Sequence, residues 1–190
     1  MQKFSKPELI SIIVILSLIS IASFFNFRVS LRRARDAQRM SDMGSMVTNL
    51  DIYKNSIGSG IFPKSDGGKL VACIGPNTTK DPQSGDYLNL VACEWGTKSL
   101  LGDLPIDPQS GQGITYVYFS DGYLYQFYAS LEGTDEAEYK TGILKRKLAC
   151  GKRICNAGKS YNQTPLDKSI EVYENELRQE QLKKLMEKKP

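Results

Sequence analysis

The sequence contains no histidine among its 190 residues. Histidine is the side chain used most often for acid–base catalysis near pH 7, and neutral imidazole is the commonest metal ligand in proteins. Its absence excludes histidine-dependent catalytic triads and zinc proteases. The formal net charge is only +4, from 25 basic and 21 acidic residues. No overall field therefore favours nucleic acid as a partner, and any basic patch has to be local.

One long apolar run lies near the N-terminus. Residues 9–27, LISIIVILSLISIASFFNF, carry no charge over 19 residues. At about 1.5 Å of rise per residue, a helix of this length crosses a hydrocarbon layer about 30 Å thick. A cleaved secretory signal is the alternative, but its apolar region is usually about 7 to 15 residues long, and no small-x-small cleavage pattern follows this run. We predict a single membrane-spanning segment.

The helix is expected to continue beyond the apolar run, from Pro7 to about Asn55. Only Gly44 opposes it, at a cost of about 1 kcal/mol relative to alanine. Gly58 or Gly60 can close the helix in the left-handed conformation. In residues 28–56, one apolar stripe recurs at spacings of three and four and is predicted to pack on a folded domain. Its members are Met40, Met43, Val47 and Leu50.

Short strands are predicted after this helix. KLVACIG and NLVACEW are near copies rich in leucine and valine, and their antiparallel pairing would bring Cys73 opposite Cys93. GITYVYF and YLYQFYASL, with SDG between them, predict a β-hairpin. The segment DPQSG occurs at Asp81 and again at Asp107. Because Asp-Pro and Ser-Gly favour turns, we interpret both copies as turns.

A second helix is predicted near the C-terminus. Thr164 would be its N-cap and Pro165 its first helical residue, with Ile170, Tyr173 and Leu177 on one face. The following segment, QEQLKKLMEKKP, is so polar that we expect it to fray or to project into solvent. The predicted organisation is a leader with the start of the helix (1–8), a transmembrane half (9–27), an amphipathic half (28–56), an antiparallel sheet domain with the cysteines (57–163) and a charged helix or tail (164–190).

Four cysteines, Cys73, Cys93, Cys150 and Cys155, all lie beyond the apolar run. An even number is consistent with disulfides outside the cytoplasm. Three pairings are possible; Cys150 with Cys155 would close a small loop, and Cys73 with Cys93 would join the similar strands. A four-cysteine zinc site is the alternative, disfavoured because Cys73 and Cys93 are 20 residues apart rather than in a knuckle.

Two charged clusters are candidate binding sites. The arginines after the apolar run are interpreted as a basic collar at the membrane surface; contact with nucleic acid is not expected, because no aromatic residues interleave them. The segment EGTDEAEY around Asp135 offers oxygen ligands suited to calcium, although a solvated acidic loop is favoured. The arginines are Arg28, Arg32, Arg33, Arg35 and Arg39, and the acids are Glu132, Asp135, Glu136 and Glu138.

Glu8, directly before the apolar run, has two interpretations. Residues 5–8, SKPE, fit the S-x-x-E capping box, in which serine and glutamate satisfy backbone amides at the start of a helix. Alternatively, Glu8 meets a positive partner, since acids near a membrane are costly unless paired and tend to mark interactions. The residues alone leave both open.

These features in this order resemble the N-terminal region of type IV pilins and of the pseudopilins of type II secretion. The resemblance rests on Phe4, four residues before Glu8, on the unbroken apolar helix, the basic RARDAQR stretch, a tyrosine-bearing helix end and the exit GIFP. A looser second match, residues 104–135, is similar to the loop and hairpin of the major pseudopilin. In the pseudopilins a calcium ion binds near the loop that corresponds to Asp135.

The resemblance implies an α+β, pilin-like fold and a structural, non-enzymatic role. In that family a membrane peptidase cuts just before the aromatic residue, the new N-terminus is often methylated, and the subunits pack their apolar helices into a filament. Here the cut would fall between Lys3 and Phe4, and Glu8 would neutralise the terminal ammonium of a neighbouring subunit. No cofactor is expected, and the partners would be further copies or other pilin-like subunits.

Lys3 stands where the family has glycine. The alternative is therefore an uncleaved, single-pass, membrane-anchored extracytoplasmic module that recruits a partner through its C-terminal helix. Counting the basic residues on either side of the apolar run places the folded domain in the cytoplasm, whereas the cysteines and the resemblance place it outside. We favour the outside, because charge counting is overridden when a whole domain follows.

Overall fold

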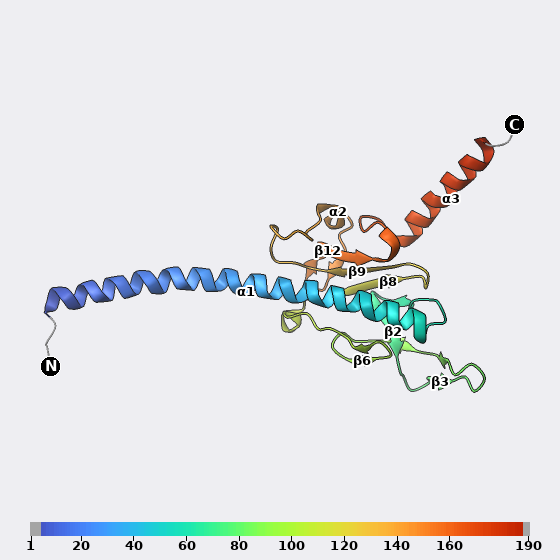
Figure 1. The fold of residues 1–190 in the computed structure, drawn as a ribbon, viewed down its shortest axis with the longest axis horizontal. Coiled ribbons are helices and arrows are strands. Elements are labelled where there is room, and N and C mark those ends of the chain that lie inside the picture. Colours follow the sequence, from blue (N-terminus) through green and yellow to red (C-terminus); the bar gives the residue numbers. More distant parts are fainter. Residues whose placement is uncertain (1–4, 188–190) are drawn as a thin grey trace.

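The computed structural model describes residues 5–187. One long helix, α1 (Lys6–Ser56), runs through the molecule; its second half lies against a small β-rich domain and its first half extends away from that domain (Figure 1). A further helix, α3 (Ile170–Glu187), projects from the opposite end. The predicted α+β class, with a long N-terminal helix, small antiparallel sheets and a C-terminal helix, is confirmed.

Helix α1 is continuous over 51 residues, a length of about 76 Å. Its end depends on two glycines with different roles. Gly60 adopts a φ of 90°, the left-handed conformation that glycine tolerates best. Gly58 is required for space, because a Cβ there would lie 2.2 Å from the Ile61 carbonyl oxygen. The amides of Gly58 and Gly60 donate to the carbonyls of Tyr53 and Lys54, which satisfies the last turn.

The predicted apolar stripe of α1 forms part of the main core. Met43 and Leu50 are fully buried, and Met40 and Val47 are partly buried against the same cluster. Met46 and Tyr53 extend the stripe at helical spacing. The helix packs on the central sheet, and the same core contains Tyr116, Tyr118, Tyr125, Phe127 and Ala129.

The central layer is a three-stranded antiparallel sheet in the order β12-β9-β8. Strands β8 (Val117–Ser120) and β9 (Tyr125–Ala129) form the predicted hairpin, in the register Val117↔Tyr128 to Ser120↔Tyr125. Its turn is held by Asp121 Oδ1, which accepts the amides of Tyr123 and Leu124. Strand β12 (Ala157–Ser160) pairs with the other edge of β9. All five residues of β9 are buried, because side chains on both of its faces enter hydrophobic clusters.

A second three-stranded sheet contains β1 (Ser65–Asp66), β2 (Lys69–Cys73) and β5 (Val91–Ala92). The two similar LVAC segments pair antiparallel here as the sequence predicts, but in another register: Val71 lies opposite Ala92, and Cys73 lies opposite Val91 rather than Cys93. The register shifts between these pairs. Cys73 is joined to Cys93, with a Cα–Cα distance of 5.3 Å.

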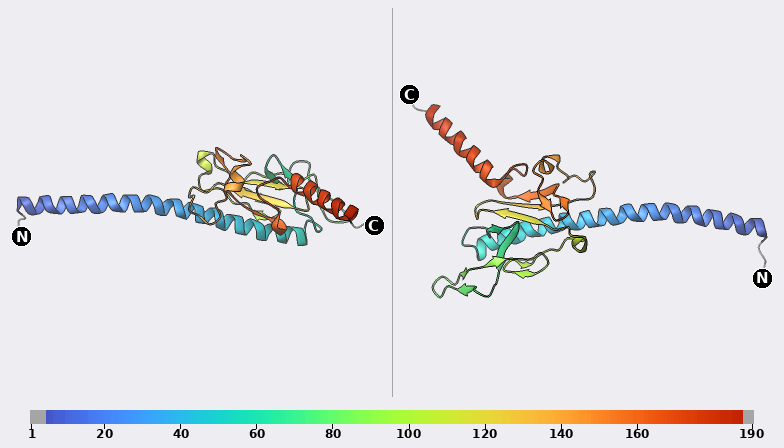
Figure 2. Two further views of the ribbon diagram at one scale, coloured as in Figure 1. Left: turned by 90° about the horizontal axis from the view of Figure 1, so that it is seen from above. Right: turned by 180° about the vertical axis from the view of Figure 1, so that it is seen from behind.

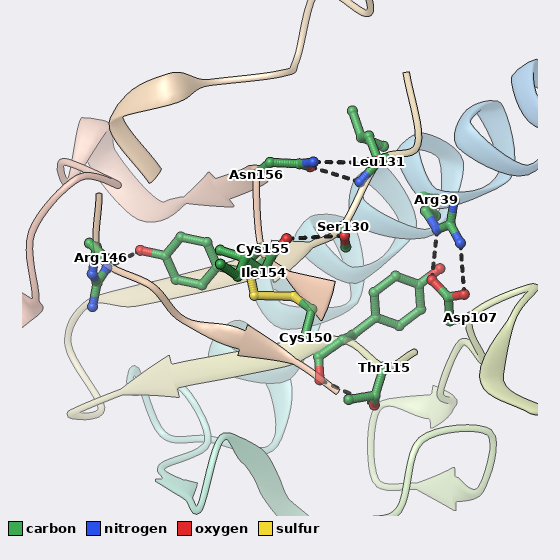
Figure 3. The surroundings of a disulfide bond; sticks show 12 residues. Arg39, Asp107, Thr115, Ser130, Leu131, Arg146, Cys150, Ile154, Cys155 and Asn156 are labelled. Carbon is green, nitrogen blue, oxygen red and sulfur yellow. Dashed lines mark hydrogen bonds and ion pairs between the residues drawn. A yellow bond between two sulfur atoms is a disulfide. The ribbon is translucent and has the colours of Figure 1, made fainter. Parts of the chain in front are cut away.

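The remaining strands form isolated two-stranded ribbons, so the β-structure is divided into several small sheets rather than one. Cys150 and Cys155 are joined at the base of one of these ribbons, and Figure 3 shows the surroundings of this disulfide. Among the described residues no cysteine is free. The ribbons are β3 (Thr79–Lys80) with β4 (Tyr87–Leu88), β6 (Lys98–Ser99) with β7 (Gly102–Asp103), and β10 (Ala149–Cys150) with β11 (Arg153–Ile154); short helices are α2 (Thr141–Leu144), η1 (Ser110–Gln112) and η2 (Tyr161–Gln163).

The predicted start of the C-terminal helix at Thr164 is wrong. Thr164 follows η2, and α3 begins six residues later, at Ile170. The Nε2 of Gln126 donates to the carbonyls of Pro165 and Lys168, which holds this stretch in a non-helical path. The start of α3 is capped by Ser169, whose Oγ accepts the Val172 amide. Beyond it the helix is regular to Glu187 and projects from the domain in all views (Figure 2).

Removal of the two disulfides is expected to cost different amounts of stability. The Cys73–Cys93 bond closes a separation of 20 residues and the Cys150–Cys155 bond one of 5. Loop-closure entropy then predicts losses of about 3 and about 2 kcal/mol, respectively. Urea unfolding of Cys73→Ala/Cys93→Ala and of Cys150→Ala/Cys155→Ala, against the parent chain, measures both. A larger loss for the shorter loop would show that packing of the buried Cys150 and Cys155, rather than chain entropy, dominates.

Candidate functional site

The apolar side chains in the N-terminal half of α1 do not pack into the hydrophobic core of the domain. The large apolar side chains from Leu9 to Phe24, and that of Phe27, are 43 to 62% exposed, and they surround the helix on all sides. Within the described residues, α1 is the one helix that is long and apolar enough to cross a membrane, by length and composition, and none of its most apolar stretch is buried by the rest of the chain. A surface of this kind has to be covered by lipid or by other apolar helices.

Three serines inside this apolar half have their hydroxyls satisfied locally. The hydroxyls of Ser11, Ser17 and Ser20 donate to the carbonyls of Pro7, Ile13 and Leu16, each four residues earlier, at 2.8 to 3.0 Å. Because unpaired hydroxyls are costly in hydrocarbon, this pattern suits an apolar surrounding. The exposed half of α1 therefore presents an almost wholly apolar outer surface.

Glu8 lies at the far end of this half, one turn from the described N-terminal end of the chain. The Ser5 amide donates to its Oε2 at 2.8 Å, and the two residues form the predicted capping box, with Pro7 in the first turn. The structure therefore provides the capping role of Glu8 directly. Lys3 and Phe4, the predicted processing residues, lie outside the described residues.

A buried ion cluster joins α1 to the domain where the exposed half ends. We call it the junction cluster; its central residue is Arg39, whose side chain is fully buried. Its Nε and Nη2 donate to the two carboxylate oxygens of Asp107 at 2.7 and 3.0 Å (Figure 3). Its Nη1 donates to Asp36 at 2.8 Å, and its Nη2 also donates to Gln109 at 2.9 Å. The guanidinium thus connects two positions on α1 to a loop about 70 residues away.

The acidic loop after β9 completes the junction cluster. Glu132 accepts two bonds from Arg35, at 2.6 and 2.8 Å, and Asp135 accepts two from Arg32, at 2.8 and 3.0 Å. In return, the Asp36 carboxylate accepts the backbone amides of Glu132 and Gly133. Side chains and backbone together clamp this loop onto α1. The cluster comprises Arg32, Arg35, Asp36, Arg39, Asp107, Gln109, Glu132 and Asp135.

The charges of the cluster support one another. Burial lowers the pKa of the Arg39 guanidinium, but the hydrogen bonds and charges of Asp107, with those from Asp36 and Glu132, outweigh burial and raise this pKa above its ordinary value. The hydrogen bond from Arg35 lowers the pKa of Glu132, although partial burial opposes this, and Arg39 lowers it further. Hydrogen bonds and opposite charges therefore favour the charged forms of Arg39 and Glu132.

One turn further along α1, Asp42 extends the polar attachment into the core. Its Oδ2 accepts the Tyr116 hydroxyl at 2.5 Å, and its Oδ1 accepts Gln38 Nε2 at 2.7 Å. Burial and then the hydrogen bond to Asp42 raise the pKa of Tyr116, which keeps the phenol protonated. Asp36 and Arg39 thus continue the apolar stripe towards the N-terminus, and Asp42 lies beside Met43 within it.

The structure corrects the interpretation of both charged clusters. Arg32, Arg35 and Arg39 do not form a free collar, because each pairs with an acid of the domain; Arg33 remains 65% exposed. Asp135, the suggested calcium ligand, pairs with Arg32 instead, and no group of three or more potential metal ligands occurs in the chain between residues 5 and 187. The sequence reasoning missed Asp107, whose DPQSG segment was explained as a turn alone.

Loss of the Arg39 charge is expected to be strongly destabilising. Arg39→Met leaves the buried carboxylates of Asp36 and Asp107 uncompensated, which costs about 3 to 5 kcal/mol. Arg33→Met is the matched control, because Arg33 is exposed and lies 3.9 Å from its acid, and its effect is expected to stay within about 0.5 kcal/mol. Urea unfolding of the full chain in detergent measures both; equal effects would contradict the anchor.

The lowered pKa of Glu132 predicts a loss of stability in acid. Because its folded pKa lies below the unfolded value of about 4.3, its contribution is present above that value and is lost as pH falls through the folded pKa. Between pH 5 and pH 2, the free energy of unfolding should fall less steeply in Glu132→Gln than in the parent. Glu136→Gln, at an acid that forms no ion pair within the described chain, should retain the parent slope.

Comparison with known proteins does not assign this chain to a family. Neither the family models, nor the curated proteins, nor the solved structures searched contain a match to this chain.

Proposed function

We propose that this chain is a structural, non-enzymatic subunit of a type IV pilus or of a type II secretion pseudopilus. The observation that carries the proposal is the division of α1 into two halves with opposite surroundings. One half is packed on a domain, and the other is apolar on all sides and extends beyond it (Figure 1). A helix of this form suits two successive environments, first lipid and then a bundle of identical helices.

Assembly through α1 requires that the domain follow the helix without a flexible joint. The junction cluster supplies this connection, since Arg39 is held at once by Asp36 on α1 and by Asp107 in the domain. Movement of the apolar half is thereby coupled to the position of the domain. A polymer in which domains occupy regular places around a core of helices needs such coupling.

Glu8 takes its assembly role only after cleavage between Lys3 and Phe4. The cut creates an ammonium group at Phe4, and Glu8 of a neighbouring subunit is its counter-ion within the apolar bundle. Before cleavage, the same carboxylate serves as the cap seen with Ser5. The two roles of Glu8 thus belong to successive stages of the same subunit.

We place the domain outside the cytoplasm, with α1 as its single membrane span. Support comes from the two disulfides, which persist in oxidising compartments and are rare in reducing ones. Prepilin peptidase and other pilin-like subunits are the partners that this placement implies.

The second candidate is an uncleaved membrane-anchored binding module. Lys3 before the expected cut and the projecting α3 favour it, because α3 leaves Leu182, Leu185 and Met186 exposed. In this case α1 is a permanent tether, and α3 recruits a partner protein.

Mass spectrometry of the native N-terminus distinguishes the two candidates. The filament subunit is expected to begin at Phe4; an N-terminus at Met1 would contradict the polymerising function. As a second test, Glu8→Gln keeps a capping side chain but removes its charge, whereas Glu8→Ala removes both. If Glu8 is a counter-ion, both variants lose filaments; if it is only a cap, Glu8→Gln assembles normally. Circular dichroism should show unchanged helix content in Glu8→Gln.

A further inference from the structure

A cleft of about 460 Å³ lies at the base of α3. Phe119, Leu148 and Ile170 provide its apolar walls, from β8, the loop before β10 and the first turn of α3. This volume is within the range of about 300 to 1,000 Å³ typical of binding pockets. The cleft is separate from the junction cluster and from the apolar half of α1.

The rim of the cleft is acidic, whereas its one cation is already satisfied. Glu171 and Glu174 are exposed on the rim and form no ion pair among the described residues; Asp121 lies beside them. Arg146 donates to Gln126 Oε1 at 3.0 Å, to the Tyr128 hydroxyl and to the Leu166 carbonyl, and lies over the Tyr128 ring. The unmet charge of the cleft is therefore negative.

The tip of α3 has the complementary character. Leu182, Leu185 and Met186 are 53 to 71% exposed and share one face at spacings of three and four. Residues 183–189 contain four lysines and one glutamate. Lys183 and Lys184 contact only acids of their own helix, at sites more than 60% exposed where such pairs contribute little. The tip is thus an apolar patch flanked by positive charge.

The tip cannot reach the cleft of its own chain. Both involve α3, a helix of 18 residues, and the tip begins at Leu182, about 18 Å along the helix axis from Ile170 in the cleft. In all views α3 points away from the domain (Figure 2). The tip of another copy of the chain, by contrast, matches the cleft in apolarity and charge.

We propose that the α3 tip of one copy docks in the α3 cleft of the next. The apolar face of the tip contacts Phe119 and Leu148, and its lysines face Glu171 and Glu174. Because the two surfaces differ, the contact is head-to-tail and extends into an open chain rather than closing a symmetric dimer. It uses neither Glu8 nor the apolar half of α1, so it is a second contact, independent of the proposed helix bundle.

Cross-linking of the full chain in detergent tests this contact. The variant Ser120→Cys/Leu185→Cys places one thiol in the cleft and one at the tip, and a short bismaleimide joins thiols without affecting the native disulfides. We expect a ladder of dimers, trimers and larger species. Neither single variant should form a ladder. Absence of the ladder, or efficient dimerisation of Leu185→Cys alone, which indicates symmetric pairing of α3 helices, would overturn the proposal.

Charge reversal in the same background separates specific docking from misfolding. The two variants are Glu171→Lys/Glu174→Lys in the cleft and Lys183→Glu/Lys184→Glu at the tip. Reversing the charge on either side should reduce the cross-linked fraction about tenfold, because like charges then face each other. The four changes together should restore it, and the control Lys140→Glu/Lys152→Glu, at exposed lysines elsewhere, should have no effect. Failure of the combined variant to recover would refute the pairing. Glu8→Gln should leave the ladder intact, so failure of the proposed filament function does not imitate failure of this contact.

Discussion

The structure depends on the burial of one guanidinium. Arg39 is wholly enclosed, and a charge in that position is stable only because Asp107 binds it through two oxygens while Asp36 and Glu132 complete its partners. These acids come from α1, from the loop before η1 and from the loop after β9. The requirement to neutralise a single cation therefore fixes three distant segments in one arrangement. The apolar core beneath it, around Met43 and Leu50, supplies the bulk of the packing but has no comparable directionality.

Much of the fold follows from local patterns in the sequence. The extent of α1, its buried stripe at Met43 and Leu50, and the hairpin around SDG follow from helical periodicity and turn chemistry, which depend on near neighbours. The duplicated LVAC segments likewise indicate which strands pair. Tertiary contacts explain the failures: Thr164-Pro165 has the residues of a helix start, yet the side chain of Gln126, 39 residues earlier than Pro165, holds the local carbonyls.

Of the candidate site, the sequence predicts the apolar half of α1 and the capping box at Ser5 and Glu8, but not the junction cluster. An uncharged run of 19 residues can be recognised as an apolar helix from the sequence alone, without knowledge of its contacts. The junction cluster joins Arg39 to Asp107 across 68 positions, and nothing in either neighbourhood specifies the other. By themselves, the five arginines suggest a basic collar. The group of acids suggests a separate, calcium-binding loop. Their mutual neutralisation becomes visible only when the chain brings them together, so charge clusters of opposite sign in one sequence should first be considered as partners.

The attachment of α1 also has a mechanical consequence. The exposed half of α1 is about 30 Å long. No hinge occurs where it meets the domain, because α1 is unbroken there. Gly44, the one glycine inside α1, lies well within the packed half. A force applied to the apolar end of α1 is therefore transmitted to the domain through Arg39 and the carboxylates of Asp107 and Glu132. The hydrogen bonds of Arg39 have fixed directions, whereas the dispersion contacts of the buried methionine side chains do not. The orientation of the domain relative to the apolar half of α1 therefore depends on these charges more than on the hydrophobic core.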